Sequence, residues 1–133
     1  MINLNSAILP GIGAAGLYIH HPLGDVMRQS ALQYNIETII NRGVIYRSES
    51  VDVWTQNDII FQIMLHGKYR GCLPHNIGIG SSLHEVRTRL GPTTLDEEDN
   101  LIVVGIEGMA LEVDVDALTS PVIEIYVFVP QRG

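Results

Sequence analysis

The second half of this chain repeats the plan of the first half at a spacing of 60 residues, and this repetition constrains the fold more than any other feature. Residues 17–26 align with residues 77–86, and a Leu or Ile, an Ile, a Leu, an acidic residue and a Val recur in register. Self-similarity at a fixed period is typical of repeated supersecondary units. We therefore expect a single domain of residues 1–133, with one repeat at about 11–71 and another at about 72–133.

Each aligned segment is expected to open a helix. In the second repeat, Ser82 and Glu85 have the spacing of a capping box, in which a hydroxyl and a carboxylate each bond a free backbone N–H group. Residues 91–92, Gly-Pro, should end that helix. In the first repeat, Pro22 suits the opening turn of a helix, which should continue to about Tyr34 along an apolar stripe.

Three strand patterns follow each helix. They are expected at 44–49, 51–56 and 59–66 in the first repeat, and at 101–106, 109–116 and 122–129 in the second. Two such units can bury their apolar faces by pooling their strands. The expected fold class is therefore α+β, with two helix-plus-three-strand repeats that form one antiparallel sheet and with the helices packed on one face.

Alternation along the strands separates an inward face from an outward one. The inward set is expected to include Ile59, Phe61, Val115, Ile123 and Val129. The outward set mixes aromatic, sulfur-containing and acidic side chains: Asp52, Trp54, Gln56, Ile60, Gln62, Met64, Glu112, Asp114, Asp116, Glu124, Tyr126 and Phe128. Aromatic anchors among charges are typical of a protein-binding surface. In the alternative interpretation, residues 1–20 cover these apolar groups.

Negative charge is concentrated towards the end of the chain. The net charge is −7, and residues 90–131 contain no Lys or Arg. Nine carboxylates lie in that stretch: Asp96, Glu97, Glu98, Asp99, Glu107, Glu112, Asp114, Asp116 and Glu124. A cluster of one sign repels nucleic acid and anionic lipid and attracts a basic partner. The alternative is a solvated acidic face that only aids solubility.

Other features of the sequence indicate a cytoplasmic protein. Residues 1–5 lack the basic region that opens a signal peptide. No stretch approaches the roughly 20 apolar residues that a membrane helix needs. Cys72 is the only cysteine, so no internal disulfide can form, and a reducing compartment fits.

Motifs for cofactors and catalysis are incomplete. Residues 11–16 match the dinucleotide pattern G-x-G-x-x-G, but a buried strand before it and a helix after it are missing, so a flexible turn is expected. Cys72 and His75 form only half of a zinc signature. Glu112 and Asp114 are expected about 7 Å apart on a straight strand, unlike the ligands of a calcium loop. We therefore expect no cofactor, no metal and no enzymatic activity.

Several segments resemble immunity proteins encoded beside the polymorphic toxins of bacteria, such as Rhs and contact-dependent inhibition systems. Residues 10–17 and 23–26 are similar to the opening pattern "PGKGIGGI-x-LG-x-SL-x-EVL" of that group. Residues 58–71 resemble its stretch "QI-x-x-x-x-GY-x-G", and residues 78–92 resemble its second "IG-x-SL-x-EV…LG-x-P". The resemblance implies a protein that holds a cognate toxin domain until the toxin is delivered to a rival cell.

The sequence therefore predicts an immunity protein that neutralises a secreted toxin domain, most often a basic nuclease, through an acidic and aromatic surface. The expected partner-binding residues are Asp52, Trp54, Asp96, Glu97, Glu98, Asp99, Glu112, Asp114, Glu124, Tyr126 and Phe128. Two alternatives remain. One is a non-enzymatic structural or assembly module of a bacterial secretion system, with a possible homodimer. The other is a small enzyme that uses Cys72 or a carboxylate pair.

Overall fold

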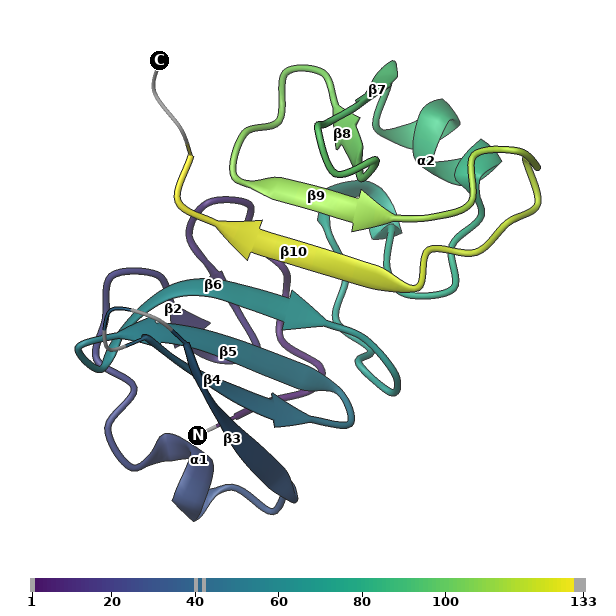
Figure 1. The fold of residues 1–133 in the computed structure, drawn as a ribbon. Coiled ribbons are helices and arrows are strands. Elements are labelled where there is room, and N and C mark those ends of the chain that lie inside the picture. The colour runs from purple at the N-terminus through teal and green to yellow at the C-terminus, as the bar shows by residue number, and fades with distance from the viewer. Residues whose placement is uncertain (1, 40, 42, 131–133) are drawn as a thin grey trace.

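The computed structural model describes residues 2–39, 41 and 43–130, and Figure 1 shows a fold made mostly of strands. The helical segments are short: α1 (Val26–Gln29), the 3-10 turn η1 (Pro74–Asn76) and α2 (Leu83–Arg89). The strands are β1 (Gly13–Ala14), β2 (Leu17–Tyr18), β3 (Tyr34–Ile39), β4 (Gly43–Ser48), β5 (Val51–Gln56), β6 (Ile59–Leu65), β7 (Thr93–Leu95), β8 (Leu101–Val103), β9 (Met109–Glu112) and β10 (Glu124–Phe128).

Eight of these strands form one antiparallel sheet, in the order β3-β4-β5-β6-β10-β9-β8-β7. Each half of the sheet is a four-stranded meander, and the two meanders meet where β6 pairs with β10, for example at Ile63 and Val127. The predicted α+β class of two helix-plus-three-strand repeats is therefore wrong. The fold is mostly β, because each half contributes four strands and very little helix.

The predicted first helix, expected to run to about Tyr34, is reduced to a short segment flanked by turns and bends. Helix α1 has only four residues and ends at Ser30, whose hydroxyl donates to the carbonyl of Met27 at 2.7 Å. The chain then enters β3, which pairs with β4 over six residues. Its sequence alternates and contains β-branched residues, which favour a strand once a partner strand is available. Pro22 lies outside the helix and forms an isolated bridge with Ile59.

The second helix has the predicted capping box. The Ser82 hydroxyl accepts a hydrogen bond from the backbone N–H of Glu85, and the Glu85 carboxylate accepts one from the N–H of Ser82, both at 3.1 Å. The helix ends at the cap Leu90, before Gly91 and Pro92, as expected. Within the described residues, no helix combines the length and the apolar character needed to cross a membrane.

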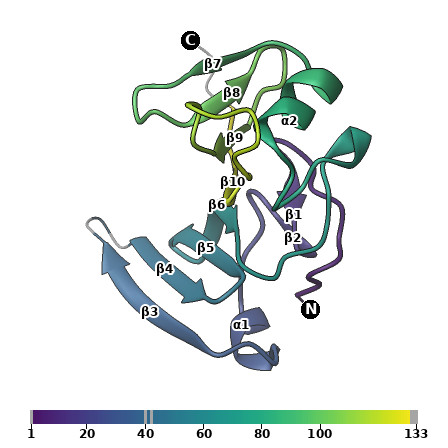
Figure 2. The same ribbon diagram turned by 90° about the vertical axis from the view of Figure 1, so that its right-hand side faces the viewer.

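The N-terminal segment packs into the main core. Ile8, Ala15 and Leu17 are buried there, and Tyr69 holds the segment through two hydrogen bonds. The Ala15 N–H donates to the Tyr69 hydroxyl at 2.8 Å, and that hydroxyl donates to the Ser6 carbonyl at 2.7 Å. In Figure 2, β1, β2, α1 and α2 all lie on the same side of the sheet. The alternative in which residues 1–20 cover the predicted binding face is therefore wrong.

The glycine-rich motif forms a tight hairpin instead of the expected flexible turn. Strands β1 and β2 pair as Gly13 with Tyr18 and Ala14 with Leu17. The two connecting residues, Ala15 and Gly16, have φ values of 57° and 78°. A two-residue hairpin turn whose twist matches that of its strands requires positive φ at both connecting residues.

A register shift between β5 and β6 changes which residues face the core. The pairing between β5 and β6 shifts after Trp54, which inserts an extra residue at Phe61. The bulge turns Ile60 inward, where it is 1% exposed, and leaves Ile59 exposed, opposite to the prediction.

The segment before β10 also differs from the prediction. Val122 is buried in place of Ile123, because the N–H of Val122 donates to the Ser81 carbonyl before β10 begins. The predicted inward residues Val115 and Val129 are also exposed.

Candidate functional site

The side of the eight-stranded sheet opposite α1, α2, β1 and β2 carries no covering layer in the described part of the chain, and we call it the open face (Figure 2). Its floor is apolar. Ile45, Met64 and Ala110 are buried, yet they do not belong to the main core cluster on the other side of the sheet. The open face therefore has a small apolar centre of its own, formed by strands from both meanders.

Strand pairing brings most of the predicted partner-binding residues onto this face. One cross-strand row contains Trp54, Gln62 and Phe128. The next row contains Asp52, Met64 and Tyr126. Glu112 and Glu124 are directly opposite each other on β9 and β10. Because residues two apart on a strand share a face, all these side chains lie on the same side of the sheet.

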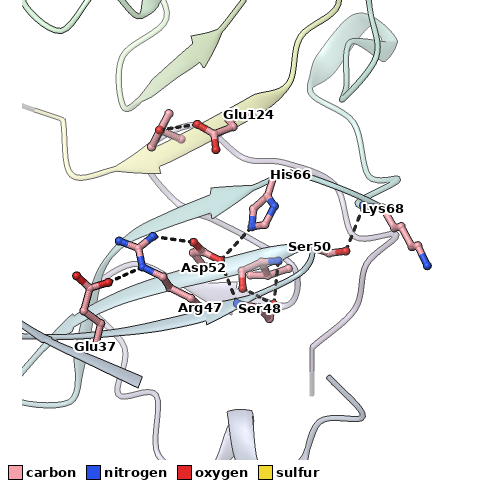
Figure 3. A network of polar contacts seen from close by, with 10 residues as sticks. Glu37, Arg47, Ser48, Ser50, Asp52, His66, Lys68 and Glu124 are labelled. Carbon is pink, nitrogen blue, oxygen red and sulfur yellow. Dashed lines mark hydrogen bonds and ion pairs between the residues drawn. The ribbon is translucent and has the colours of Figure 1, made fainter. Parts of the chain in front are cut away.

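A polar network crosses the first meander on the open face, and Figure 3 shows it. Asp52, whose side chain is only 4% exposed, is its centre. Its carboxylate accepts hydrogen bonds from Arg47 Nη1 at 3.1 Å, His66 Nε2 at 3.0 Å and the Ser48 N–H at 3.1 Å. A buried carboxylate persists when such donors replace water. The carboxylate of Asp52 therefore binds donors of its own chain and supports the surface, whereas the sequence predicted Asp52 as a contact residue.

Arg47 links this network to the exposed part of the face. Its Nε donates to the Glu37 carboxylate at 2.6 Å, and its guanidinium carbon lies 5.5 Å from the ring centroid of Trp54. The two carboxylates hold the pKa of Arg47 above its usual range, chiefly through the hydrogen bond with Glu37. Sequence reasoning missed Arg47, Glu37 and His66. These residues come together only through strand pairing, in which Arg47 lies opposite Asn35 and next to the strand that carries Asp52.

Glu112 and Glu124 lie opposite each other on β9 and β10, and each carboxyl group changes the pKa of the other. The hydrogen bond with Glu124, together with burial, raises the pKa of Glu112 to about 7. Burial opposes ionisation of Glu124, but the hydrogen bonds from Glu112 and Tyr126 outweigh it and lower the Glu124 pKa. The Tyr126 hydroxyl donates to Glu124 at 2.8 Å. Burial and these acids keep the pKa of Tyr126 above its usual range, so its hydroxyl stays a donor.

A hollow of about 740 Å³ lies on the open face beside these residues. Its lining combines sheet residues with the turn between β7 and β8: Gln62, Leu95, Asp96, Glu97, Glu98, Asn100, Ile102, Ala110, Tyr126 and Phe128. Asp96 shapes the turn, because its Oδ1 accepts the N–H groups of Glu98 and Asn100, both at 2.9 Å. The structure thus brings the acidic turn next to the two C-terminal aromatics.

Two predicted site residues do not join the face. Asp114 is exposed beyond the end of β9, and its Oδ1 accepts the N–H of Asp116 at 2.9 Å. The predicted straight strand through 116 is therefore wrong, because β9 ends at Glu112. Asp99 stands in the β7–β8 turn with φ of 63° and does not line the hollow. Within the described ranges, no group of three His, Cys, Asp or Glu side chains is placed to hold a metal ion.

Comparison with known proteins gives a likeness of fold. The chain is similar to the crystal structure of a cysteine-rich secretory protein from Staphylococcus aureus subsp. aureus Mu50, with a TM-score of 0.55 and 13% sequence identity. The match covers 96% of this chain and 48% of that chain, so this chain spans about half the length of the protein it matches. No family model matches the chain, and a search of curated proteins finds no match.

Proposed function

We propose that this chain is a non-catalytic, cytoplasmic immunity protein, which binds a basic toxin domain through the open face and keeps that domain inactive in the cell that makes it. The observation that carries the proposal is the concentration of Trp54, Tyr126 and Phe128 on an uncovered face beside the acidic β7–β8 turn. Partly exposed aromatic side chains with a rim of charge are the composition expected of a protein interface.

The two kinds of residue have different roles in this proposal. The carboxylates of the turn attract a basic partner over a distance of several ångströms and accelerate the encounter. The aromatic rings then lose water on contact and supply most of the affinity. The rings are half-buried and held in place by the sheet, which reduces the entropy lost on binding. Tyr126 is further held by its hydrogen bond to Glu124.

The direct test is co-expression with the C-terminal domain of a toxin encoded immediately upstream of this gene. We expect the chain to restore growth and to form a complex with that domain. Trp54→Ala and Phe128→Ala should each weaken the complex about thirtyfold, which is about 2 kcal/mol for a residue at the centre of an interface. Normal growth rescue and unchanged affinity in both variants would contradict the proposed face.

The steering role needs a separate test with a matched control. The triple variant Glu97→Gln, Glu98→Gln and Asp99→Asn removes three charges from the turn. We expect about a tenfold slower association at low salt and a weaker dependence of that rate on ionic strength. The control Glu49→Gln, Asp114→Asn and Asp116→Asn removes the same charge away from the hollow and should change the rate much less. Equal slowing in both variants would show that the association rate depends on net charge and not on the position of the carboxylates in the turn.

A second candidate function is a structural or assembly module that pairs with its own kind. The observation that favours it is strand β3, which is an edge of the sheet and exposes Ile36 to 61%. An exposed edge strand offers unpaired backbone groups to another strand. The similar solved structure is named as a secretory protein, and the match covers 48% of that chain. Self-association that Ile36→Lys abolishes, without any toxin rescue, would favour this candidate over the first.

A further inference from the structure

The open face already binds one arginine, which belongs to the chain itself. The guanidinium of Arg47 donates to the carboxylates of Glu37 and Asp52 (Figure 3). Its carbon also lies over the ring of Trp54. An aromatic ring and carboxylates together suit a guanidinium, because the ring face attracts positive charge and the carboxylate oxygens accept its planar N–H groups.

The hollow presents the same chemistry without a cation from the chain. Tyr126 and Phe128 provide its aromatic surface, and Asp96, Glu97 and Glu98 provide carboxylates at its edge. Within the described ranges, no Lys or Arg forms an ion pair with any of these three acids. The sequence between 90 and 131 also contains no Lys or Arg.

The carboxylates are available to a ligand to different degrees. Asp96 uses Oδ1 to fold the turn and keeps its second oxygen free of hydrogen bonds to described residues. Glu97 and Glu98 are exposed, and their side chains form no hydrogen bond to described residues. Glu98 lines the same hollow as Tyr126 and Phe128, so this glutamate lies beside the aromatic surface. A cation between Glu98 and the rings would therefore contact a carboxylate and the face of an aromatic ring at the same time.

We propose that the hollow binds an arginine side chain of the partner protein, with the guanidinium against Phe128 and Tyr126 and paired with the carboxylates of the β7–β8 turn. This inference rests on the proposed function for the identity of the partner, and it names the group that the open face recognises. Arginine fits better than lysine, because its flat guanidinium can stack on a ring and bond a carboxylate at the same time. An ammonium group is more strongly hydrated and cannot stack.

The test uses a short probe and does not need the partner. Acetyl-Gly-Arg-Gly-amide is titrated into the ¹⁵N-labelled full chain, and amide chemical shifts are followed by NMR. We expect saturable shifts at residues 95–100 and at Tyr126 and Phe128. The lysine peptide should bind about fivefold more weakly because it cannot stack, and the citrulline peptide, which has the same shape without charge, should not bind.

Variants locate the probe. Phe128→Leu removes the ring but keeps an apolar side chain, and Glu98→Gln removes one carboxylate. Each should weaken arginine-peptide binding several-fold. The control Glu49→Gln removes the same charge in the turn between β4 and β5, outside the hollow, and should bind as the unaltered chain does. The amide spectrum of each variant reports whether it is folded.

The proposal is overturned if shifts spread over the surface without saturation, if lysine binds as well as arginine, or if both hollow variants bind normally. Its failure is separable from failure of the proposed function. A toxin domain that binds while the arginine peptide does not would remove the arginine site and keep the immunity role. An arginine peptide that binds a chain with no rescuing activity would support the site and remove the immunity role.

Discussion

The Nε2 atom of His66 lies 3.0 Å from Oδ1 of Asp52, and this contact joins the residue that follows strand β6 to a carboxylate buried on β5. The same carboxylate accepts from Arg47 and from the Ser48 N–H. Asp52→Ala would leave these donors without their acceptor. We expect a loss of about 2–3 kcal/mol in the free energy of unfolding, less than for a fully buried pair because Arg47 is partly exposed.

Urea denaturation followed by Trp54 fluorescence would measure this loss. The matched control is Glu37→Gln, which removes the other carboxylate partner of Arg47. The Glu37 side chain is 52% exposed, so its loss should cost only about 0.5 kcal/mol. Similar costs for the two variants would show that Asp52 does not support the face as the geometry indicates.

The raised pKa of Glu112 predicts a stability that falls between about pH 5 and pH 8. The pKa of Glu112 is raised from 4.5 to about 7 in the folded chain, so the folded state binds more protons than the unfolded state in this window. Stability must then decrease as pH rises through 7. The lowered pKa of Glu124 acts at more acidic pH, where it reduces stability as pH falls, and it does not cancel the effect.

Glu112→Gln should flatten this dependence. The amide can still donate to Glu124, and it carries no charge to repel that carboxylate. We expect little change at pH 5 and a gain on the order of 1–2 kcal/mol at pH 8, discounted for the partial exposure of the pair. Thermal unfolding at both pH values would measure it, with Glu49→Gln as a control that should shift neither value. An unchanged pH profile in Glu112→Gln would contradict the raised pKa of Glu112 as its cause.

The capping box of α2 predicts a measurable loss in Ser82→Ala. The substitution removes the acceptor for the Glu85 N–H, so we expect about 1 kcal/mol less stability. Thr88→Ala is the control, because Thr88 is exposed within the same helix and Ala has the higher helix propensity. It should be neutral or slightly stabilising. Thermal denaturation by circular dichroism would compare the two, and equal effects would argue against the cap.

Gly108 is predicted to be the least replaceable glycine of the β8–β9 turn. It has φ of 80°, and an added Cβ would collide with the backbone of Gly11. Its carbonyl also accepts the N–H groups of Gly11 and Phe128, both at 3.0 Å. Gly108→Ala should therefore cost about 2–4 kcal/mol from the strained backbone and the forced displacement of the N-terminal segment.

Gly105→Ala separates these two causes. Gly105 has φ of 91°, but a Cβ there would meet open space, so only the backbone strain of about 1 kcal/mol applies. Chemical denaturation of both variants gives the difference directly. A cost for Gly105→Ala as large as that for Gly108→Ala would show that the approach of Gly11 contributes nothing.

Local patterns in the sequence were sufficient for several features. The alternation in residues 122–129 predicted that Tyr126 and Phe128 share a face with Glu124, because side chains two apart on a strand always do. The spacing of Ser82 and Glu85 predicted the helix cap, since both hydrogen bonds are made within one turn. These features depend on neighbours within a few residues, and a sequence displays such neighbours directly.

Pairing between distant strands decided the rest. The four-residue length of α1, the bulge at Phe61 and the end of β9 at Glu112 follow from which strand lies alongside, and sequence periodicity contains no such information. The same holds for the site. The sequence alone determined that aromatics and acids are present and which of them alternate together. Only the tertiary structure decided that the acidic turn lies beside Tyr126 and that Arg47 reaches Asp52, because such contacts depend on strand order and register.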